Sequence, residues 1–117
     1  MNAHQIGQAF EAQAVAELLS LGWSILNRNY KGADGEIDII AFKNGILWFV
    51  EVKGSRRQHS RPERSITPLK QRRISRAASV WLAGTDIEPE EISFVACAIT
   101  PMGIRWITDA FDAQGEA

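Results

Sequence analysis

Two apolar runs joined by a tight turn constrain the fold of this chain more than any other feature of its sequence. Residues 37–42 and 46–52 are rich in β-branched and aromatic side chains, and Lys43-Asn44-Gly45 between them is a strong β-hairpin signal. One face is expected to carry Ile37, Ile39, Trp48, Val50 and Val52, and the other Ile40, Phe42, Leu47 and Phe49. Because both faces are apolar, the sheet has to be covered on both sides, most simply by helices.

The segment before the hairpin is expected to form one helix and one short strand. Apolar residues recur every three or four positions from Ile6 to Leu21, and Gly22 follows where a helix C-cap is expected. A short strand is predicted at residues 23–26. The strand should lead into a polar, turn-rich stretch from Asn27 to Gly35, in which Gly32-Ala33-Asp34-Gly35 is predicted to be a loop.

The segment after the hairpin is expected to hold a loop, a second helix and two strands. Residues 54–66 are polar and basic without a sustained period, whereas Thr67 and Pro68 are typical of a helix start, and that helix should end before Gly84. Residues 92–100 and 104–107 are predicted strands. We therefore predict an α/β fold of order α-β-β-β-α-β-β, with a mixed central sheet flanked by helices in a single domain over residues 1–117.

The register of the hairpin brings charged residues together on one face. If Asn44 and Gly45 are the two loop residues, Asp38 faces Glu51, and Glu36 faces Lys53. Like charges that face each other across a strand pair are destabilising. A shared divalent cation would explain the two acids, because Mg²⁺ is typically held by one or two carboxylates, with waters and substrate phosphate completing its coordination.

Lys53 lies one strand step beyond Glu51, where it could orient an attacking water or stabilise charge on a phosphate. The alternative interpretation is that the acids mark strand ends and that Lys53 forms a cross-strand ion pair with Glu36. The charges interrupt a strongly apolar strand, however, and this favours the metal site, with Mg²⁺ or Mn²⁺ held by Asp38 and Glu51.

Basic residues are concentrated in the segment after the hairpin. From Lys53 to Arg76 there are nine basic residues against one acid, Glu63, a net charge of +8 in a chain whose total is −1. Such a segment suits contacts with the phosphate backbone of a nucleic acid, and an ordinary solvated face is the alternative. The residues expected to bind nucleic acid are Arg56, Arg57, Arg61, Arg64, Lys70, Arg72, Arg73 and Arg76.

Cysteine usage and hydropathy favour a cytoplasmic protein. Cys97 is the single cysteine, so the chain cannot form an internal disulfide. The first residues do not combine a basic stretch with an apolar run, and no segment approaches the ~20 apolar residues that span a bilayer. The four tryptophans, Trp23, Trp48, Trp81 and Trp106, stand at apolar positions and are expected in the core.

The hairpin also resembles a known family. Gly35-Glu36-Ile37-Asp38-Ile39-Ile40, followed by Phe49-Val50-Glu51-Val52-Lys53, is similar to the YraN-like family of bacterial proteins. That family belongs with the PD-(D/E)xK nuclease superfamily and is similar to archaeal Holliday-junction resolvases. The resemblance extends over nearly the whole chain, with further matches at Gly7, Glu11, Ala14, Arg28, Asn29, Lys70, Ala110 and Phe111.

The resemblance implies a restriction-endonuclease-like fold and roles for four residues. Asp38 and Glu51 would be the metal-binding acids, Lys53 the catalytic lysine, and Glu11 the acid contributed by the first helix. The implied activity is Mg²⁺- or Mn²⁺-dependent cleavage of DNA, with branched or flapped DNA as the substrate and a homodimer by analogy with resolvases.

Three positions depart from the family pattern. Ile37 replaces the proline of the superfamily's name, Ser55 stands where an arginine is expected, and Ser93-Phe94-Val95 replaces Arg-Phe-Asp. Two other hypotheses therefore stay open. One is a catalytically inactive nucleic-acid-binding module that keeps the nuclease fold, and the other is an interaction protein whose basic segment binds an acidic partner.

Overall fold

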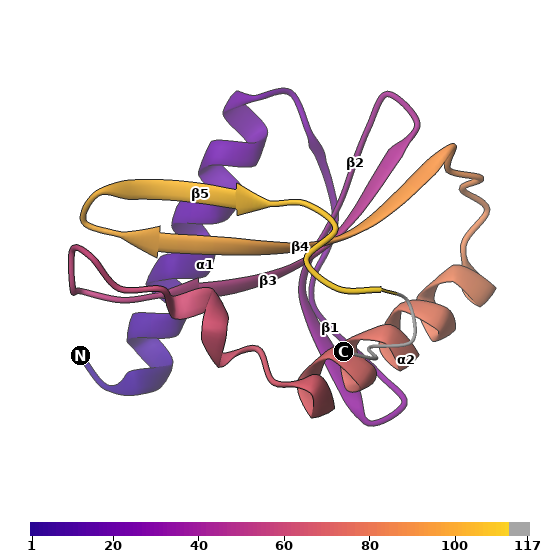
Figure 1. The fold of residues 1–117 in the computed structure, drawn as a ribbon. Coiled ribbons are helices and arrows are strands. Elements are labelled where there is room, and N and C mark those ends of the chain that lie inside the picture. The colour runs from indigo at the N-terminus through magenta and orange to yellow at the C-terminus, as the bar shows by residue number, and fades with distance from the viewer. Residues whose placement is uncertain (113–117) are drawn as a thin grey trace.

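The predicted β-hairpin is present and lies within a five-stranded sheet (Figure 1). The computed structural model describes residues 1–112, and residues 113–117 of the predicted domain lie outside the described part. The elements are α1 (Ala3–Ser20), β1 (Ser24–Gly32), β2 (Gly35–Lys43), β3 (Ile46–Gly54), a one-turn 3-10 helix η1 (Pro62–Ser65), α2 (Pro68–Gly84), β4 (Glu91–Thr100) and β5 (Gly103–Ile107). The predicted order of helices and strands is confirmed.

The sheet is mixed, as predicted. The strands lie side by side in chain order, and every neighbouring pair is antiparallel except β3 and β4, which are parallel. Parallel neighbours need a long connection, and α2 supplies it between β3 and β4. The carboxyl end of β3 therefore leads toward the start of α2.

Helices α1 and α2 cover opposite faces of the sheet (Figure 1). On the α1 side, Leu18 is buried with Val50 and the other residues of one core cluster. On the α2 side, Ile74 is buried with Phe49 in a second cluster. The prediction of a sheet covered on both faces by helices is confirmed. Among the described residues, no helix is long and apolar enough to cross a membrane.

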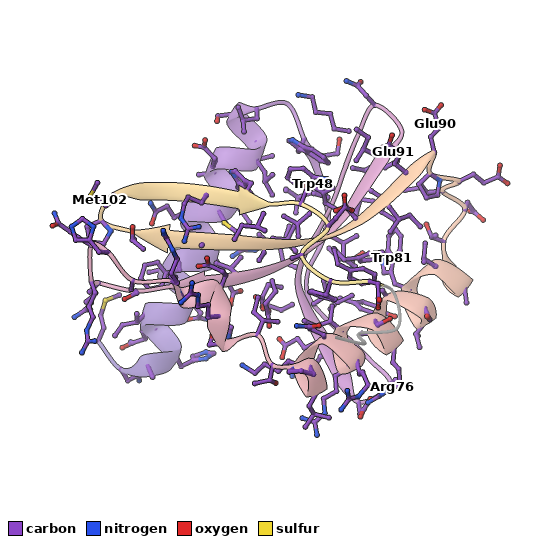
Figure 2. The ribbon with its side chains drawn as sticks, in the orientation of Figure 1. Trp48, Arg76, Trp81, Glu90, Glu91 and Met102 are labelled. Atoms are coloured by element: carbon purple, nitrogen blue, oxygen red, sulfur yellow. The ribbon has the colours of Figure 1, made fainter. Side chains whose placement is uncertain are left out.

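The tryptophans pack in these cores, as predicted (Figure 2). The Trp48 ring lies between those of Trp23 and Trp106, with centroid distances of 4.1 and 5.7 Å. On the other face, Trp81 contacts Phe49 edge to face at 5.9 Å. Offset and edge-to-face contacts add to the stability gained from burial of these large rings.

The register predicted for the hairpin is confirmed between Lys43↔Ile46 and Ile39↔Val50, whereas the predicted pairs Asp38–Glu51 and Glu36–Lys53 lie beyond the end of the ladder. The β2–β3 ladder runs from Lys43↔Ile46 at the turn to Ile39↔Val50. Asn44 and Gly45 form the two-residue loop, with φ angles of 50° and 81°. Positive φ at both loop residues is the geometry of a type I′ turn, and it matches the twist of the flanking strands.

The loop predicted at residues 32–35 is confirmed, but the strand before it is longer than the predicted 23–26. Strand β1 continues to Gly32 and pairs with β2, so that Ala33 and Asp34 alone separate Gly32 from Gly35. The polar composition of residues 27–32 hid this extension because β1 is an edge strand, and the side chains along it are exposed or half-buried. An edge strand of this kind does not need the apolar pattern of a central strand.

The predicted face of Ile37 is also wrong. Ile37 is buried in the α2-side cluster, whereas Ile39, two residues later, is buried in the α1-side cluster. The strict alternation of faces is interrupted at Asp38. On the neighbouring strand, Asn29 lies between the pairs Arg28↔Ile39 and Tyr30↔Ile37 and has a φ of 51°, a left-handed conformation that asparagine tolerates. The sheet is therefore irregular at the level of the predicted acids.

Two glycines allow the helices to approach the ends of the central strands. A Cβ at Gly35, the first residue of β2, would overlap the backbone carbonyl of Arg73 in α2. A Cβ at Gly54, the last residue of β3, would overlap the ring of Phe10 in α1. Both helices therefore pack closely against the strand ends that carry the acids and Lys53.

We predict that Gly35→Ala lowers the free energy of unfolding by more than about 2 kcal/mol, because the clash is with backbone and cannot be relieved by a rotamer change. Gly84→Ala is the matched control, since a Cβ at the end of α2 meets nothing within 4 Å. Its effect should stay within about 0.5 kcal/mol. Urea unfolding followed by tryptophan fluorescence measures both variants, and equal stability of the two would contradict the close approach.

Candidate active site

A cleft of about 560 Å³ opens between the two helices at one end of the sheet. Its base is formed by the start of β2 and the end of β3, with Glu36, Asp38, Glu51 and Lys53. The first half of α1 lines one side with Ala3, Ile6, Gly7, Phe10 and Glu11, and α2 lines the other with Lys70, Arg73 and Ile74. The structure thus brings the four predicted hairpin residues and Glu11 into one cleft.

Asp38 and Glu51 meet where the hairpin ladder stops. The next pair after Ile39↔Val50 would be Asp38 with Glu51, and at this position the side chain of Asp38 replaces backbone pairing. Its Oδ2 accepts a hydrogen bond of 2.7 Å from the backbone N–H of Val52. The two carboxyl groups are within hydrogen-bonding contact of each other.

Burial and the neighbouring Glu51 change the acidity of Asp38. Its pKa is raised from 3.8 to about 8, chiefly by burial and then by the adjacent Glu51 carboxyl. The Val52 N–H and the ammonium of Lys53 oppose the rise. At neutral pH the pair therefore holds a proton, because two ionised carboxylates in contact repel each other strongly.

Lys53 and Lys70 form a second pair of like charges in the same cleft. Both side chains line the cleft, and the pKa of Lys70 is lowered mainly by the neighbouring Lys53 and further by partial burial. Glu51 and Asp38 act in the opposite direction and favour the charged form of Lys70. The sequence had assigned Lys70 to a DNA-binding surface, whereas the structure places it at the acids.

Glu11 lies at the α1 side of the cleft. It is half-buried, and its pKa is raised by burial first and then by the charges of Asp38 and Glu36. Arg28 and a hydrogen bond from the side chain of Asn29 lower it. Asn29 had no predicted role. Its left-handed backbone at the irregular position of β1 coincides with this contact to Glu11.

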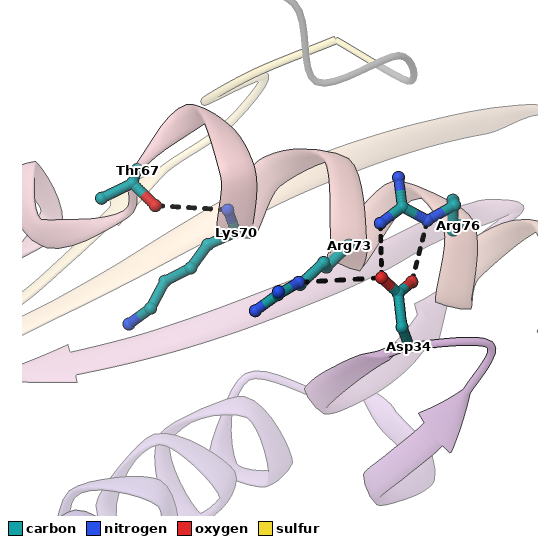
Figure 3. A network of polar contacts seen from close by, with 5 residues as sticks. All are labelled: Asp34, Thr67, Lys70, Arg73 and Arg76. Atoms are coloured by element: carbon teal, nitrogen blue, oxygen red, sulfur yellow. Dashed lines mark hydrogen bonds and ion pairs between the residues drawn. The ribbon is translucent and has the colours of Figure 1, made fainter.

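The basic segment is divided among several parts of the fold. Its eight predicted nucleic-acid-binding residues are all exposed, but Arg73 and Arg76 are bound to Asp34 in the β1–β2 turn (Figure 3). Arg76 donates two hydrogen bonds to that carboxylate, at 2.8 and 2.7 Å, and Arg73 lies at 3.7 Å. These contacts hold α2 to the turn and reduce the charge that the helix offers to a ligand.

The remaining cations lie on and near the loop after β3. Arg56, Arg57 and Arg61 stand on that loop, Arg64 in η1 and Arg72 on α2. Ser55, at the position where the resemblance expects an arginine, donates its backbone N–H to Ile99 at 2.9 Å, and its hydroxyl accepts from the backbone N–H of Arg57 at 3.1 Å. The serine therefore shapes the start of the loop and adds no charge at the cleft.

The other departures from the family pattern lie outside the cleft. Val95 is completely buried in the sheet, and Ser93 exchanges hydrogen bonds with Asp109. Glu63, the one acid of the basic segment, pairs with Arg105 at 2.8 Å. These residues stabilise the fold and are not among those that line the cleft.

The donor set of the cleft fits a hard divalent cation. Two carboxyl groups in contact offer the oxygen ligands that Mg²⁺ and Mn²⁺ prefer, and Mg²⁺ sites typically use one or two carboxylates. Within residues 1–112, no group of three or more acidic, histidine or cysteine side chains is gathered closely enough to hold a metal ion. Asp38 and Glu51 are the residues of the cleft that could hold such an ion, with waters and substrate as further ligands.

The raised pKa of Asp38 predicts that the metal-free protein loses stability as the pH rises. Between the ordinary pKa of 3.8 and the folded value of about 8, the folded chain holds a proton that the unfolded chain has released. From pH 5 to pH 8 the free energy of unfolding should fall by about 3 to 4 kcal/mol more in the wild type than in Asp38→Asn.

Chemical denaturation in EDTA at the two pH values measures this difference. Asp86→Asn is the matched control, because it makes the same chemical change at an exposed position, and it should keep the wild-type pH dependence. If Asp38→Asn also keeps that dependence, the carboxyl pair does not hold a proton at neutral pH.

Similarity to other bacterial proteins extends over nearly the whole chain. It is 38% identical to a protein of Symbiobacterium thermophilum, over 95% of the chain and 99% of the relative. It is 42% identical to one of Geotalea daltonii, over 92% and 89%, and 40% identical to one of Lachnoclostridium phytofermentans, over 98% and 99%. All three relatives are named as UPF0102 proteins, and the model of that family matches residues 10–112. The chain therefore belongs to the uncharacterised protein family UPF0102.

Proposed function

We propose that this protein is a Mg²⁺- or Mn²⁺-dependent DNA endonuclease of the PD-(D/E)xK type. The observation that carries the proposal is the contact of the Asp38 and Glu51 carboxyl groups in a cleft that also holds Lys53. Two acids in contact are unfavourable for the fold by themselves, so their position calls for a functional reason. The resemblance to YraN-like proteins supports the same assignment.

Each residue of the cleft has a distinct role in the proposed reaction. Bound between Asp38 and Glu51, the cation would polarise the phosphate and lower the pKa of a water ligand. The ammonium of Lys53, beside the two acids, donates hydrogen bonds to the attacking water or to the phosphate oxygen on which charge develops. The Glu11 carboxylate, across the cleft on α1, orients water through hydrogen bonds that it accepts.

The exposed arginines supply affinity for the DNA backbone. Arg56, Arg57, Arg61, Arg64 and Arg72 are exposed on or near the loop that follows β3. Contacts with phosphates give binding that weakens steeply with salt and depends little on sequence. Arg73 and Arg76 contribute less to this affinity, because Asp34 already neutralises part of their charge. The resolvase resemblance adds branched or flapped DNA as the substrate and a homodimer as the active form.

A catalytically inactive DNA-binding module is the second candidate. The absence of a charged side chain at Ser55 favours it, as does the raised pKa of Asp38, which allows the two acids to share a proton without a metal. This candidate predicts salt-sensitive binding of DNA without cleavage of any DNA structure in Mg²⁺ or Mn²⁺.

We predict that Asp38→Asn and Lys53→Ala each slow cleavage by at least about 100-fold, as the loss of a group that stabilises transition-state charge does. Cleavage should be followed on branched, flapped, single-stranded and linear DNA with Mg²⁺ or Mn²⁺. In EDTA, fluorescence anisotropy should give Asp38→Asn the same affinity for DNA as the wild type at neutral pH, since Asp38 is already protonated there and the substitution leaves the charge of the metal-free cleft unchanged.

Asp86→Asn serves as the control for the cleavage assay and should cleave at the wild-type rate. Wild-type rates in Asp38→Asn or Lys53→Ala would exclude the cleft as the active site. Binding without cleavage by the wild type on every substrate would favour the inactive module.

A further inference from the structure

Lys70 differs in its surroundings from the other cations of α2. It lies in the first turn of the helix, where its backbone N–H donates to the Thr67 hydroxyl at 3.2 Å, and its side chain runs parallel to that of Arg73 (Figure 3). Arg73 and Arg76 reach the Asp34 carboxylate, whereas Lys70, which lines the cleft as Arg73 does, lies beside Lys53. Among the described residues, the close ion pairs do not include Lys70.

Lys53 and Lys70 line the same cleft, and their like charges repel each other, so an anion beside them is favoured. In the metal-free cleft, Glu51 and Asp38 supply this negative charge and favour the charged form of Lys70. A divalent cation held by the same two carboxylates would cancel their negative charge. The charges of Lys53 and Lys70 would then be left to an anion that enters the cleft, and a phosphodiester is such an anion.

We propose that Lys70 and Lys53 together bind the phosphate that is cut, so that Lys70, from α2, contacts its non-bridging oxygens opposite the two carboxylates. This inference rests on the proposed function and assigns to it a further catalytic residue. The acids and the lysines would thus divide the cleft into a metal side and a phosphate side.

Inorganic phosphate is a suitable probe, because its binding does not depend on cleavage. Titration of phosphate into the Mg²⁺-saturated protein, followed by amide NMR shifts, should give binding at least fivefold weaker in Lys70→Ala than in the wild type. Lys70→Arg should recover part of the loss. Lys31→Ala is the matched control, since Lys31 is exposed on β1 outside the cleft-lining residues, and it should leave phosphate binding unchanged.

Magnesium affinity separates a phosphate contact from a merely structural role. Loss of the Lys70 charge removes a cation that acts on Asp38 and Glu51, so Mg²⁺ should bind Lys70→Ala as tightly as the wild type or more tightly. A structural defect would instead weaken both Mg²⁺ and phosphate binding, and it would overturn the proposal. So would phosphate affinity that is equal in wild type and Lys70→Ala, or a wild type that does not bind phosphate.

Cleavage distinguishes this inference from the proposed function. If the wild type cleaves DNA, single-turnover cleavage at saturating protein should be at least tenfold slower in Lys70→Ala and unchanged in Lys31→Ala. If the wild type does not cleave any DNA, the selective loss of phosphate binding in Lys70→Ala still supports the phosphate site, while the nuclease proposal fails.

Discussion

The hydrogen bond from the Val52 N–H to the Asp38 carboxylate is the contact on which the candidate site depends. It forms where the β2–β3 ladder ends, so a side chain completes the pairing that backbone would otherwise make. This fixes the Asp38 carboxyl beside Glu51 and leaves room between the strand ends for a cleft. The close approaches at Gly35 and Gly54 then place α2 and α1 on either side of it.

The cleft keeps like charges together, which is costly for a fold unless a ligand compensates them. Burial and contact raise the pKa of Asp38, and the neighbouring Lys53 lowers the pKa of Lys70. The first shift reduces the negative charge of the acids, and the second reduces the positive charge of the lysines. A divalent cation at the acids and a phosphate at the lysines would restore full charge to both pairs. Arg73 and Arg76 of α2 do not need such a ligand, because their charges are already compensated by Asp34.

Local sequence signals predicted much of this arrangement. The Asn44-Gly45 turn set the hairpin register, the Thr67-Pro68 pair marked the start of α2, and the register brought Asp38 to Glu51. Features that depend on tertiary packing could not be read in this way. Edge strand β1 is polar because it is half-exposed, and Ile37 is buried in the α2-side cluster although the alternation from Ile39 assigns it to the other face. The pairing of Arg73 and Arg76 with Asp34, and the position of Lys70 beside Lys53, join segments that are distant in sequence.

The most direct test of a shared metal site is calorimetric titration of Mg²⁺ and Mn²⁺ into the wild type and Asp38→Asn at pH 7, repeated in buffers of different ionisation enthalpy. Because Asp38 with a pKa of about 8 is largely protonated at pH 7, binding to both carboxylates should release a proton and tighten as the pH rises. Asp38→Asn should lose both the affinity and the proton release. Wild-type protein that does not bind either metal, even with DNA present, or a variant that binds them equally well, would contradict the account.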